Sequence, residues 1–108
     1  MAIRLERRTD PDGSRVLVPI GDLDREAADR LTEAVEDDLA HSPGVLVISL
    51  THVSFCDSSG IVTLLEAHAG AKRRDTELVL ADVDGHLRNL FRLCALDQVI
   101  RIVEESHD

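Results

Sequence analysis

Four small or polar residues, Asp57, Ser58, Ser59 and Gly60, separate an apolar segment from a segment with the apolar spacing of a helix. A serine at a helix start can cap the helix, because the first backbone N–H groups lack partners within it. The same N–H groups and the helix dipole also tolerate a phosphate on such a serine. The stretch therefore leaves two roles open, helix capping and a phosphorylation switch.

Two neighbouring residues favour a surface that meets another molecule. Gly60 has no side chain, so a partner could approach the helix start closely. Val62 lies one helical turn beyond Ser58 and outside the apolar stripe of the helix, so we expect it to be exposed. An exposed apolar side chain beside a hydroxyl indicates a contact surface.

An enzymatic role for Ser58 has little support in the sequence. A serine nucleophile needs a base within hydrogen-bond reach, and the chain contains neither G-x-S-x-G nor S-x-x-K. Neither glycine-rich phosphate-binding motif occurs. Cys56 and Cys94 are expected to be small hydrophobes in apolar surroundings, and no cysteine or histidine pair has metal-ligand spacing. We predict a protein that is not an enzyme and holds no metal or cofactor.

Composition and charge limit the partners. The 108 residues suit one domain, 44% are hydrophobic and only 2% are aromatic, so the core must be aliphatic. With 12 Lys and Arg against 21 Asp and Glu, the net charge of −9 repels nucleic acid and favours a partner with a basic face. No apolar run is longer than that from Val45 to Ile48, which is too short for membrane insertion, and charges near the N-terminus leave no apolar signal region. We expect a cytoplasmic protein.

The elements that would position these residues follow from the periodicity. Residues 3–8 and 15–20 flank a turn at 11–13 and predict a β-hairpin. Residues 21–44 contain a helix that Asp24 can cap, with apolar residues at steps of three and four. The apolar face of this helix comprises Ala27, Leu31, Ala34, Val35 and Leu39.

Residues 45–50 are almost all apolar, so this strand should be covered on both faces, as in the middle of a parallel sheet. A second helix begins at Ser58 and places Thr63 outside its apolar face. The remaining elements are a strand at 77–83, a helix at 85–96 and a strand at 98–103, before a polar, unstructured tail at 104–108.

The element order β-β-α-β-α-β-α-β predicts one α/β domain over residues 1–108, with a core at about 3–103 and a mixed, mostly parallel sheet. Right-handed crossovers place the helices mainly on one face. Loops at the carboxyl ends of the parallel strands then meet at one edge, where sites in open α/β sheets usually form. This brings G-D-L-D (21–24) close to D-S-S-G (57–60). We expect an acidic rim around Ser58 from Asp22, Asp24, Glu26 and Asp57.

The chain closely resembles the STAS domain, and within it the bacterial anti-sigma-factor antagonists, from about Ile3 to Val103. Three stretches carry the resemblance: G-D-L-D at 21–24, V-S-F-C-D-S-S-G-I-V-T-L-L at 53–65 and L-R-N-L-F-R-L-C-A-L-D-Q-V-I-R-I at 87–102. D-S-S-G alone is weakly specific, but its place after an apolar strand and between the other two stretches makes the match strong.

The resemblance implies a partner-switching function. In this family the unphosphorylated antagonist binds an anti-sigma factor that is also a serine kinase, and this binding frees the sigma factor. The kinase then phosphorylates the first serine of D-S-S-G, here Ser58, the complex separates, and a serine phosphatase resets the switch. Asp24 matches the acid of the family's G-x-L-D loop, and Ser59 would be mainly a cap. The implied partner-binding residues are Asp22, Asp24, Asp57, Ser58, Ser59, Gly60 and Val62.

Two departures from the family pattern bear on the partner. Val62 stands where the family often has Gly or a polar residue, which could alter partner choice. Many members carry a helix after the last strand, and here only residues 104–108 follow, so part of the sheet is expected to be poorly covered, with a weak homodimer as one way to cover it. A second interpretation stays open, because some STAS domains are non-switching subunits of membrane lipid-transport ATPases.

Overall fold

The computed structural model describes residues 3–104, in which one five-stranded sheet carries three α-helices. The strands follow one another in the order β1-β2-β3-β4-β5, antiparallel between β1 and β2 and parallel at every later pair. The predicted α/β class with a mixed, mostly parallel sheet is confirmed. The elements are β1 (Arg4–Thr9), β2 (Arg15–Ile20), α1 (Arg25–Leu39), β3 (Val45–Ser49), α2 (Ser58–Arg73), β4 (Glu77–Ala81), α3 (Gly85–Leu93), the short 3-10 helix η1 (Leu96–Gln98) and β5 (Arg101–Val103).

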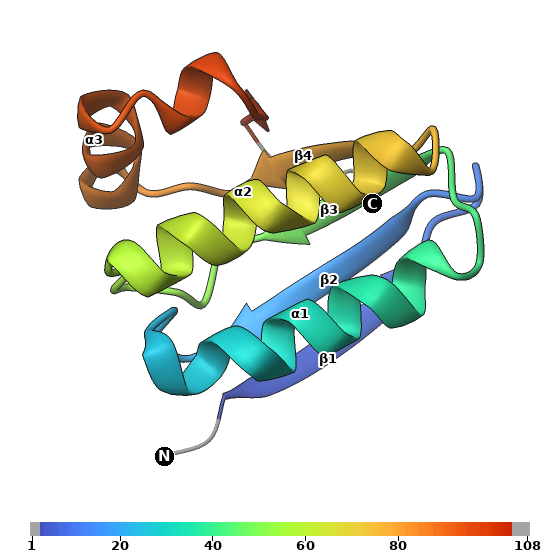
Figure 1. The fold of residues 1–108 in the computed structure, drawn as a ribbon, viewed down its shortest axis with the longest axis horizontal. Helices are drawn as coiled ribbons and strands as arrows, with labels where there is room; N and C mark the ends of the chain where they lie inside the picture. Colours follow the sequence, from blue (N-terminus) through green and yellow to red (C-terminus); the bar gives the residue numbers. More distant parts are fainter. Residues whose placement is uncertain (1–2, 105–108) are drawn as a thin grey trace.

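The helices pack on one face of the sheet, as predicted. Figure 1 shows α1 and α2 side by side across this face, with α3 beyond the end of β4. Leu46 and Ile48 of β3 point into the same core as Leu87 and Phe91 of α3, so all three helices share it. This arrangement puts the starts of α1 and α2 at the same edge of the sheet.

The opposite face of the sheet has a smaller apolar centre. Val16, Val47, Val79 and Ala81 project from β2, β3 and β4 and are at most 8% exposed. The central strand is therefore covered on both faces, as its apolar sequence predicted. These four side chains are buried within a single chain, while Val18, Val45 and Val103 beside them are only partly buried, so the expected poor cover is limited to the margin of this face.

A buried carboxylate ties the β1–β2 hairpin to α1. The Asp38 side chain is 1% exposed, and its Oδ1 accepts hydrogen bonds from Nε of Arg7 and Nε of Arg15, both at 3.0 Å. Arg7 also donates to the carbonyl of Ala34 at 3.2 Å. The two guanidinium groups compensate the charge of Asp38, which a carboxylate needs in order to remain buried.

The apolar face of α2 differs from the prediction at one position. Thr63 is buried, although its polarity placed it outside that face. Its Oγ1 donates to the carbonyl of Ser59 at 2.8 Å, so the hydroxyl finds its partner within the helix and can enter the core.

The end of the chain also differs from the prediction. The third helix stops at Leu93, because Ala95 adopts a left-handed conformation with φ of 62°. Cys94 is consequently exposed, where a buried position was expected, while Cys56 is buried as predicted. The last strand is confined to Arg101–Val103, and residues 105–108 of the expected polar tail lie outside the described part of the chain.

Candidate functional site

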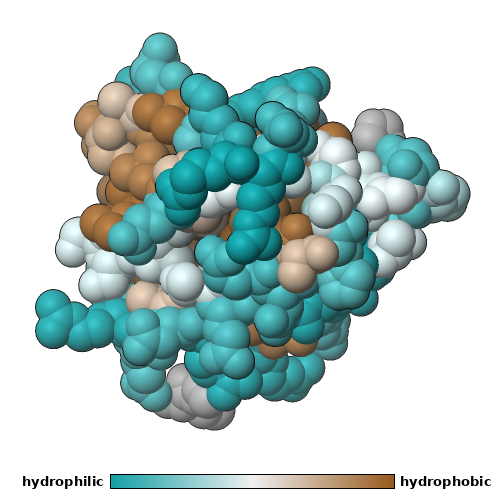
Figure 2. All heavy atoms as spheres, turned by 45° about the vertical axis from the view of Figure 1, so that its right-hand side comes forward, coloured by the Kyte–Doolittle hydropathy of each residue, from teal (hydrophilic) through white to brown (hydrophobic). Residues whose placement is uncertain are grey.

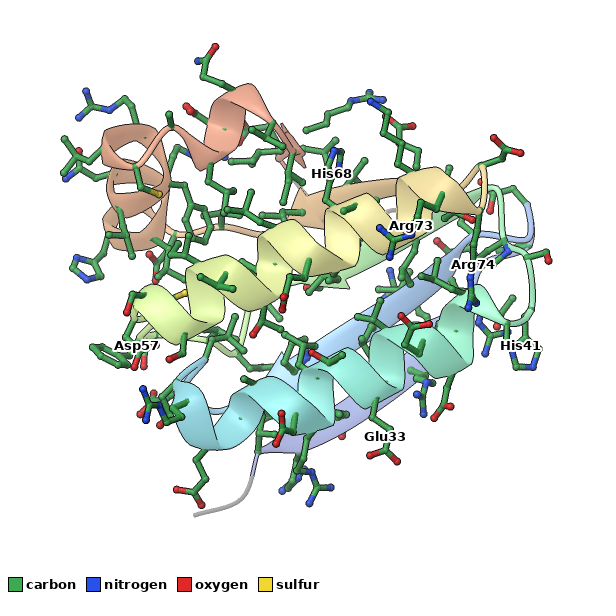
Figure 3. The ribbon with its side chains drawn as sticks, viewed as in Figure 1. Glu33, His41, Asp57, His68, Arg73 and Arg74 are labelled. Carbon is green, nitrogen blue, oxygen red and sulfur yellow. The ribbon has the colours of Figure 1, made fainter. Side chains whose placement is uncertain are left out.

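The two polar loops meet through their backbones at the carboxyl edge of β2 and β3. The Leu23 N–H donates to the carbonyl of Phe55 at 2.9 Å, and the Asp57 N–H donates to the carbonyl of Leu23 at 3.2 Å. A further bond joins the Gly21 N–H to the carbonyl of His52 at 3.2 Å. The predicted proximity of G-D-L-D and D-S-S-G is confirmed, and Figure 3 shows Asp57 at the start of α2, beside the loop that leads into α1.

Aspartates cap both helices at this edge. Asp24 Oδ1 accepts from the Ala27 N–H at 3.0 Å, as the sequence predicted for α1. Asp57 Oδ1 accepts from the Gly60 N–H at 3.1 Å and so caps α2. The expectation that a serine caps α2, with Ser59 as the main candidate, is wrong, because Asp57 occupies that place.

The cap by Asp57 leaves Ser58 available to another molecule. Ser58 is exposed, and its hydroxyl makes no hydrogen bond within residues 3–104. Ser59 is half-buried and accepts the Thr63 hydroxyl through its backbone carbonyl. Of the two serines, Ser58 therefore offers the more accessible oxygen for a chemical modification.

Gly60 does not leave open space for a partner, which corrects the sequence-based interpretation. It is buried, and a Cβ at this position would lie 2.6 Å from Cys56 Sγ and 2.9 Å from Leu23 Cβ. The chain itself fills the space beside this glycine. Gly60 therefore lets the first turn of α2 pack against the loop at 21–24, and little of its surface is exposed.

Val62 is exposed as predicted, and it has an apolar companion that the sequence did not single out. The exposed fraction is 52% for Val62 and 48% for Phe55, which lies two residues before the cap of α2. Nothing in the apolar pattern distinguishes Phe55 from a core residue. Its carbonyl accepts the Leu23 N–H, which holds its backbone in place.

Acidic groups border the loop pair. Asp22 is exposed, whereas Asp24 and Asp57, which cap α1 and α2, are half-buried. Beside them lies a hollow of about 440 Å³, which is lined by both carboxylates and apolar side chains. The hollow is lined by Ile3, Arg4, Ile20, Gly21, Asp22, Asp24, Glu26 and Ala27.

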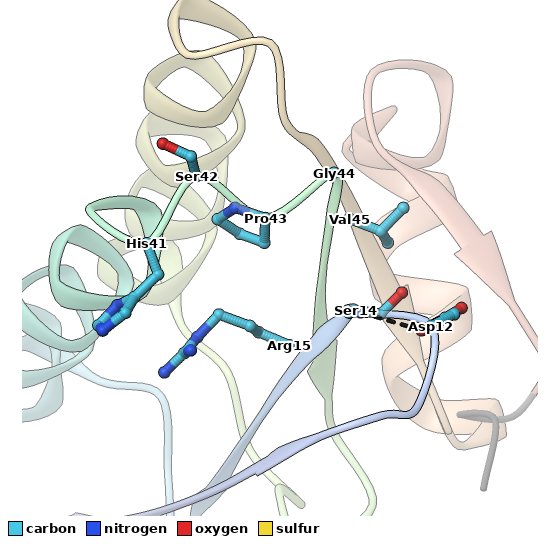
Figure 4. Close-up of a pocket in the computed structure, with 9 residues that line it drawn as sticks. Asp12, Ser14, Arg15, His41, Ser42, Pro43, Gly44 and Val45 are labelled. Carbon is cyan, nitrogen blue, oxygen red and sulfur yellow. Dashed lines mark hydrogen bonds between the residues drawn. The ribbon is translucent and has the colours of Figure 1, made fainter.

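A second hollow, of about 290 Å³, lies at the opposite edge of the sheet, between the β1–β2 turn and the loop before β3 (Figure 4). Its cationic side chain, Arg15, is already paired with Asp38. Asp12 accepts from the Ser14 N–H at 2.9 Å and so holds the turn. These contacts belong to the scaffold, and they lie far from the loops at the carboxyl edge.

The other groups considered in the sequence contribute no chemistry to this edge. Burial, with a smaller effect from the charge of Asp57, raises the pKa of the Cys56 thiol to about 12, so it stays protonated and unreactive. Within residues 3–104, no group of three or more His, Cys, Asp or Glu side chains is arranged so that it could bind a metal ion. None of the helices in this range combines the length and the apolarity that crossing a membrane requires.

The family model of the STAS domain matches residues 3–108. The chain belongs to the STAS domain family. The anti-sigma-B factor antagonist of Listeria monocytogenes is 34% identical to it over 82 residues, which cover 76% of this chain and 72% of that protein. The resemblance to anti-sigma-factor antagonists that the sequence indicated is therefore confirmed.

Solved structures agree with this assignment. An anti-sigma factor antagonist from Mycobacterium paratuberculosis superposes with a TM-score of 0.81 at 26% identity, covering 93% of this STAS domain and 84% of that chain. The phosphorylated form of SpoIIAA, a cell fate determinant of Bacillus, gives a TM-score of 0.69 at 16% identity, with 94% and 93% of the two chains covered. The second likeness concerns the fold alone.

Proposed function

We propose that this STAS domain is an anti-sigma-factor antagonist that works by partner switching. Its unphosphorylated form binds an anti-sigma factor that is also a serine kinase, and this binding frees the sigma factor. The observation that carries the proposal is the position of Ser58, which is exposed and without a hydrogen bond in the described chain, at the start of a helix that Asp57 caps. The curated relative from Listeria, an antagonist by name, supports the same class.

Phosphorylation of Ser58 is the step that dissociates the complex with the anti-sigma kinase. The kinase transfers the γ-phosphoryl group of ATP to Ser58 Oγ, the hydroxyl proton passes to a base of the kinase, and ADP leaves. A serine phosphatase restores the hydroxyl by hydrolysis and releases inorganic phosphate. The whole cycle belongs in the cytoplasm, where ATP and the sigma factor are found.

The helix start can accept the phosphate without rearranging. Asp57 accepts the N–H groups of Gly60 and Ile61 through its side chain and carbonyl, at 3.1 and 3.0 Å. The N–H groups of Ser58 and Ser59 stay at the open end of the helix, where they and the dipole favour an anion. The phosphorylated protein should therefore keep its fold.

The partner surface would not accept the phosphate. The modification adds a charge of roughly −1.5 to −2 at neutral pH, next to Asp57 and close to the loop of Asp24. A partner fitted to a bare hydroxyl would bury this charge without compensation, at a cost of about 2–5 kcal/mol. That corresponds to a roughly 30- to 4,000-fold loss of affinity.

The decisive experiment combines phosphorylation with binding. The STAS domain is incubated with ATP and each anti-sigma kinase encoded by its organism, and the modified residue is mapped by mass spectrometry. Ser58→Ala should bind the kinase and resist phosphorylation, Ser58→Asp should fold normally and bind poorly, and Ser59→Ala should still be phosphorylated. Phosphate on Ser59 alone, or full binding by the Ser58-phosphorylated protein, would contradict the proposal.

A further inference from the structure

The exposed apolar side chains of the molecule are unevenly placed. Within residues 3–104 the large hydrophobic side chains that are exposed number four, and two of them, Phe55 and Val62, border Ser58. The other two, Leu93 and Val99, belong to the end of α3 and to the segment after η1. Figure 2 shows a largely hydrophilic face, with hydrophobic residues gathered to one side of it.

Phe55 is an unusual choice for a surface position in this chain. The sequence contains two aromatic residues, and the other, Phe91, is fully buried in the core. The hydrogen bond from the Leu23 N–H to the carbonyl of Phe55 holds the backbone of Phe55 in place. An aromatic side chain on a fixed backbone loses little entropy when a partner covers it, and it offers a large contact area.

Val62 extends the same surface along α2. It follows Ser58 by four residues, so the two side chains are neighbours on one face of the helix. The two loops that meet beside this apolar pair carry acidic residues, with Asp22 and Asp24 on either side of Leu23, which pairs with Phe55, and Asp57 on the other loop. An apolar centre within a charged rim is the usual anatomy of a specific protein interface.

We propose that Phe55 and Val62 form the apolar anchor of the partner-binding surface, and that the partner presents an apolar patch bordered by Lys and Arg. This inference rests on the proposed function, because it assigns the contacts that hold the anti-sigma kinase. Charge selects the partner, since the chain carries a net charge of −9 and acidic groups flank the anchor. The apolar pair supplies the affinity, because a few well-packed central residues dominate most interfaces.

The anchor also explains why a single phosphate could release the partner. Ser58 lies between Phe55 and Val62 along the chain, so the phosphate would enter the part of the interface from which water is excluded. A charge in such a place has no solvent to stabilise it. The partner must then give up the apolar contacts in order to hydrate the phosphate, and neither Phe55 nor Val62 has to move.

The test measures binding by purified anti-sigma kinases of the same organism, one at a time and without ATP. Phe55→Ala should raise the Kd at least tenfold, about 1.4 kcal/mol, and Val62→Ala should raise it severalfold. Leu93→Ala and Val99→Ala are matched controls, since both remove exposed apolar side chains elsewhere, at 72% and 50% exposure, and they should change the Kd less than twofold. Thermal unfolding of all four variants checks that each one is folded.

The outcomes separate this inference from the proposed function. If a kinase binds the wild type and Phe55→Ala equally well, the anchor is wrong and the proposed function stands. If Leu93→Ala weakens binding instead, the anchor lies on α3 and the inference is likewise wrong. If no kinase binds the wild type, both fail. If sedimentation shows a wild-type dimer that Phe55→Ala dissociates, the surface takes a second copy of the chain and the inference is overturned.

Discussion

Gly60 lies so close to Leu23 that no side chain fits between them. A Cβ on residue 60 would lie 2.9 Å from Leu23 Cβ, which is closer than Cβ atoms approach other atoms in proteins. It would also clash with the Leu23 carbonyl. The same carbonyl accepts the N–H of Asp57. The contact therefore joins the two halves of the candidate site, and glycine is what allows it.

Replacing Gly60 with Ala should destabilise the fold by about 1–3 kcal/mol, because backbone atoms of Leu23 must move to make room. The better helix propensity of Ala offsets part of this, by up to about 1 kcal/mol. Gly85→Ala is the matched control, since Gly85 also lies in the first turn of a helix but a Cβ added there would meet nothing within 4 Å, and it should be neutral or slightly stabilising. Urea unfolding measures both, and equal stabilities would show that the Leu23 contact is loose.

The spacing of apolar residues in the sequence predicted the buried helix faces well wherever the buried residues are apolar. The apolar face of α1 from Ala27 to Leu39 is buried throughout, because residues three and four apart share one side of a helix. Thr63 and Asp38 are buried for another reason, since each finds a hydrogen-bond partner at its buried position. Such hydrogen-bond partners depend on the local fold, so the polarity of a residue alone does not predict its burial.

The meeting of the two loops could be predicted from topology, because the carboxyl ends of neighbouring parallel strands share an edge. The roles of the individual residues within the loops could not be predicted in this way. Asp57 and Ser58 are both good capping residues, and a shift of one residue in the helix start decides which of them caps. Phe55 had no signal in the sequence, since an aromatic residue beside an apolar segment is more often part of the core.

Asp38→Ala should destabilise the protein by about 1–3 kcal/mol, because Arg7 and Arg15 lose a charged hydrogen-bond acceptor. The loss stays below that of a fully buried pair, since both guanidinium groups are partly exposed and can be hydrated. Asp37→Ala is the control: its side chain is exposed and lies 3.9 Å from Arg7, so it should cost well under 1 kcal/mol. A smaller effect at Asp38 than at Asp37 in urea unfolding would refute this assignment.

The two cysteines should differ sharply in reactivity. At pH 8 iodoacetamide should modify exposed Cys94 and leave Cys56 unmodified until the protein unfolds, because burial raises the pKa of Cys56 from 9.0 to about 12. A raised thiol pKa also means that the unfolded state loses this proton first. The contribution of the neutral Cys56 thiol to the free energy of unfolding is therefore complete below about pH 9 and decreases as the pH rises towards 12. The variant Cys56→Ala should lack this pH dependence. Peptide mass spectrometry reads the labelling, and equal labelling of both cysteines in the folded protein would contradict the burial of Cys56.

Asp24 combines a structural and an electrostatic role, and two substitutions separate them. Asp24→Asn keeps an oxygen for the Ala27 N–H and should leave stability nearly unchanged, whereas Asp24→Ala should cost about 1 kcal/mol by losing the cap. Both remove one charge from the acidic rim, so both should slow association with a basic partner at low salt, by about three- to tenfold. The difference from wild type should shrink as salt rises, because screening shortens the reach of exposed charges.

Asp29→Asn controls for overall charge, since Asp29 is exposed on α1 and caps no helix. If the rim guides the partner, Asp29→Asn should associate with the kinase nearly as fast as wild type, although its net charge equals that of Asp24→Asn. Stopped-flow measurements over a salt series give the association rate constants directly. Equal slowing by the two Asn variants would mean that net charge alone attracts the partner, and Asp24 would then be a helix cap with no special part in binding.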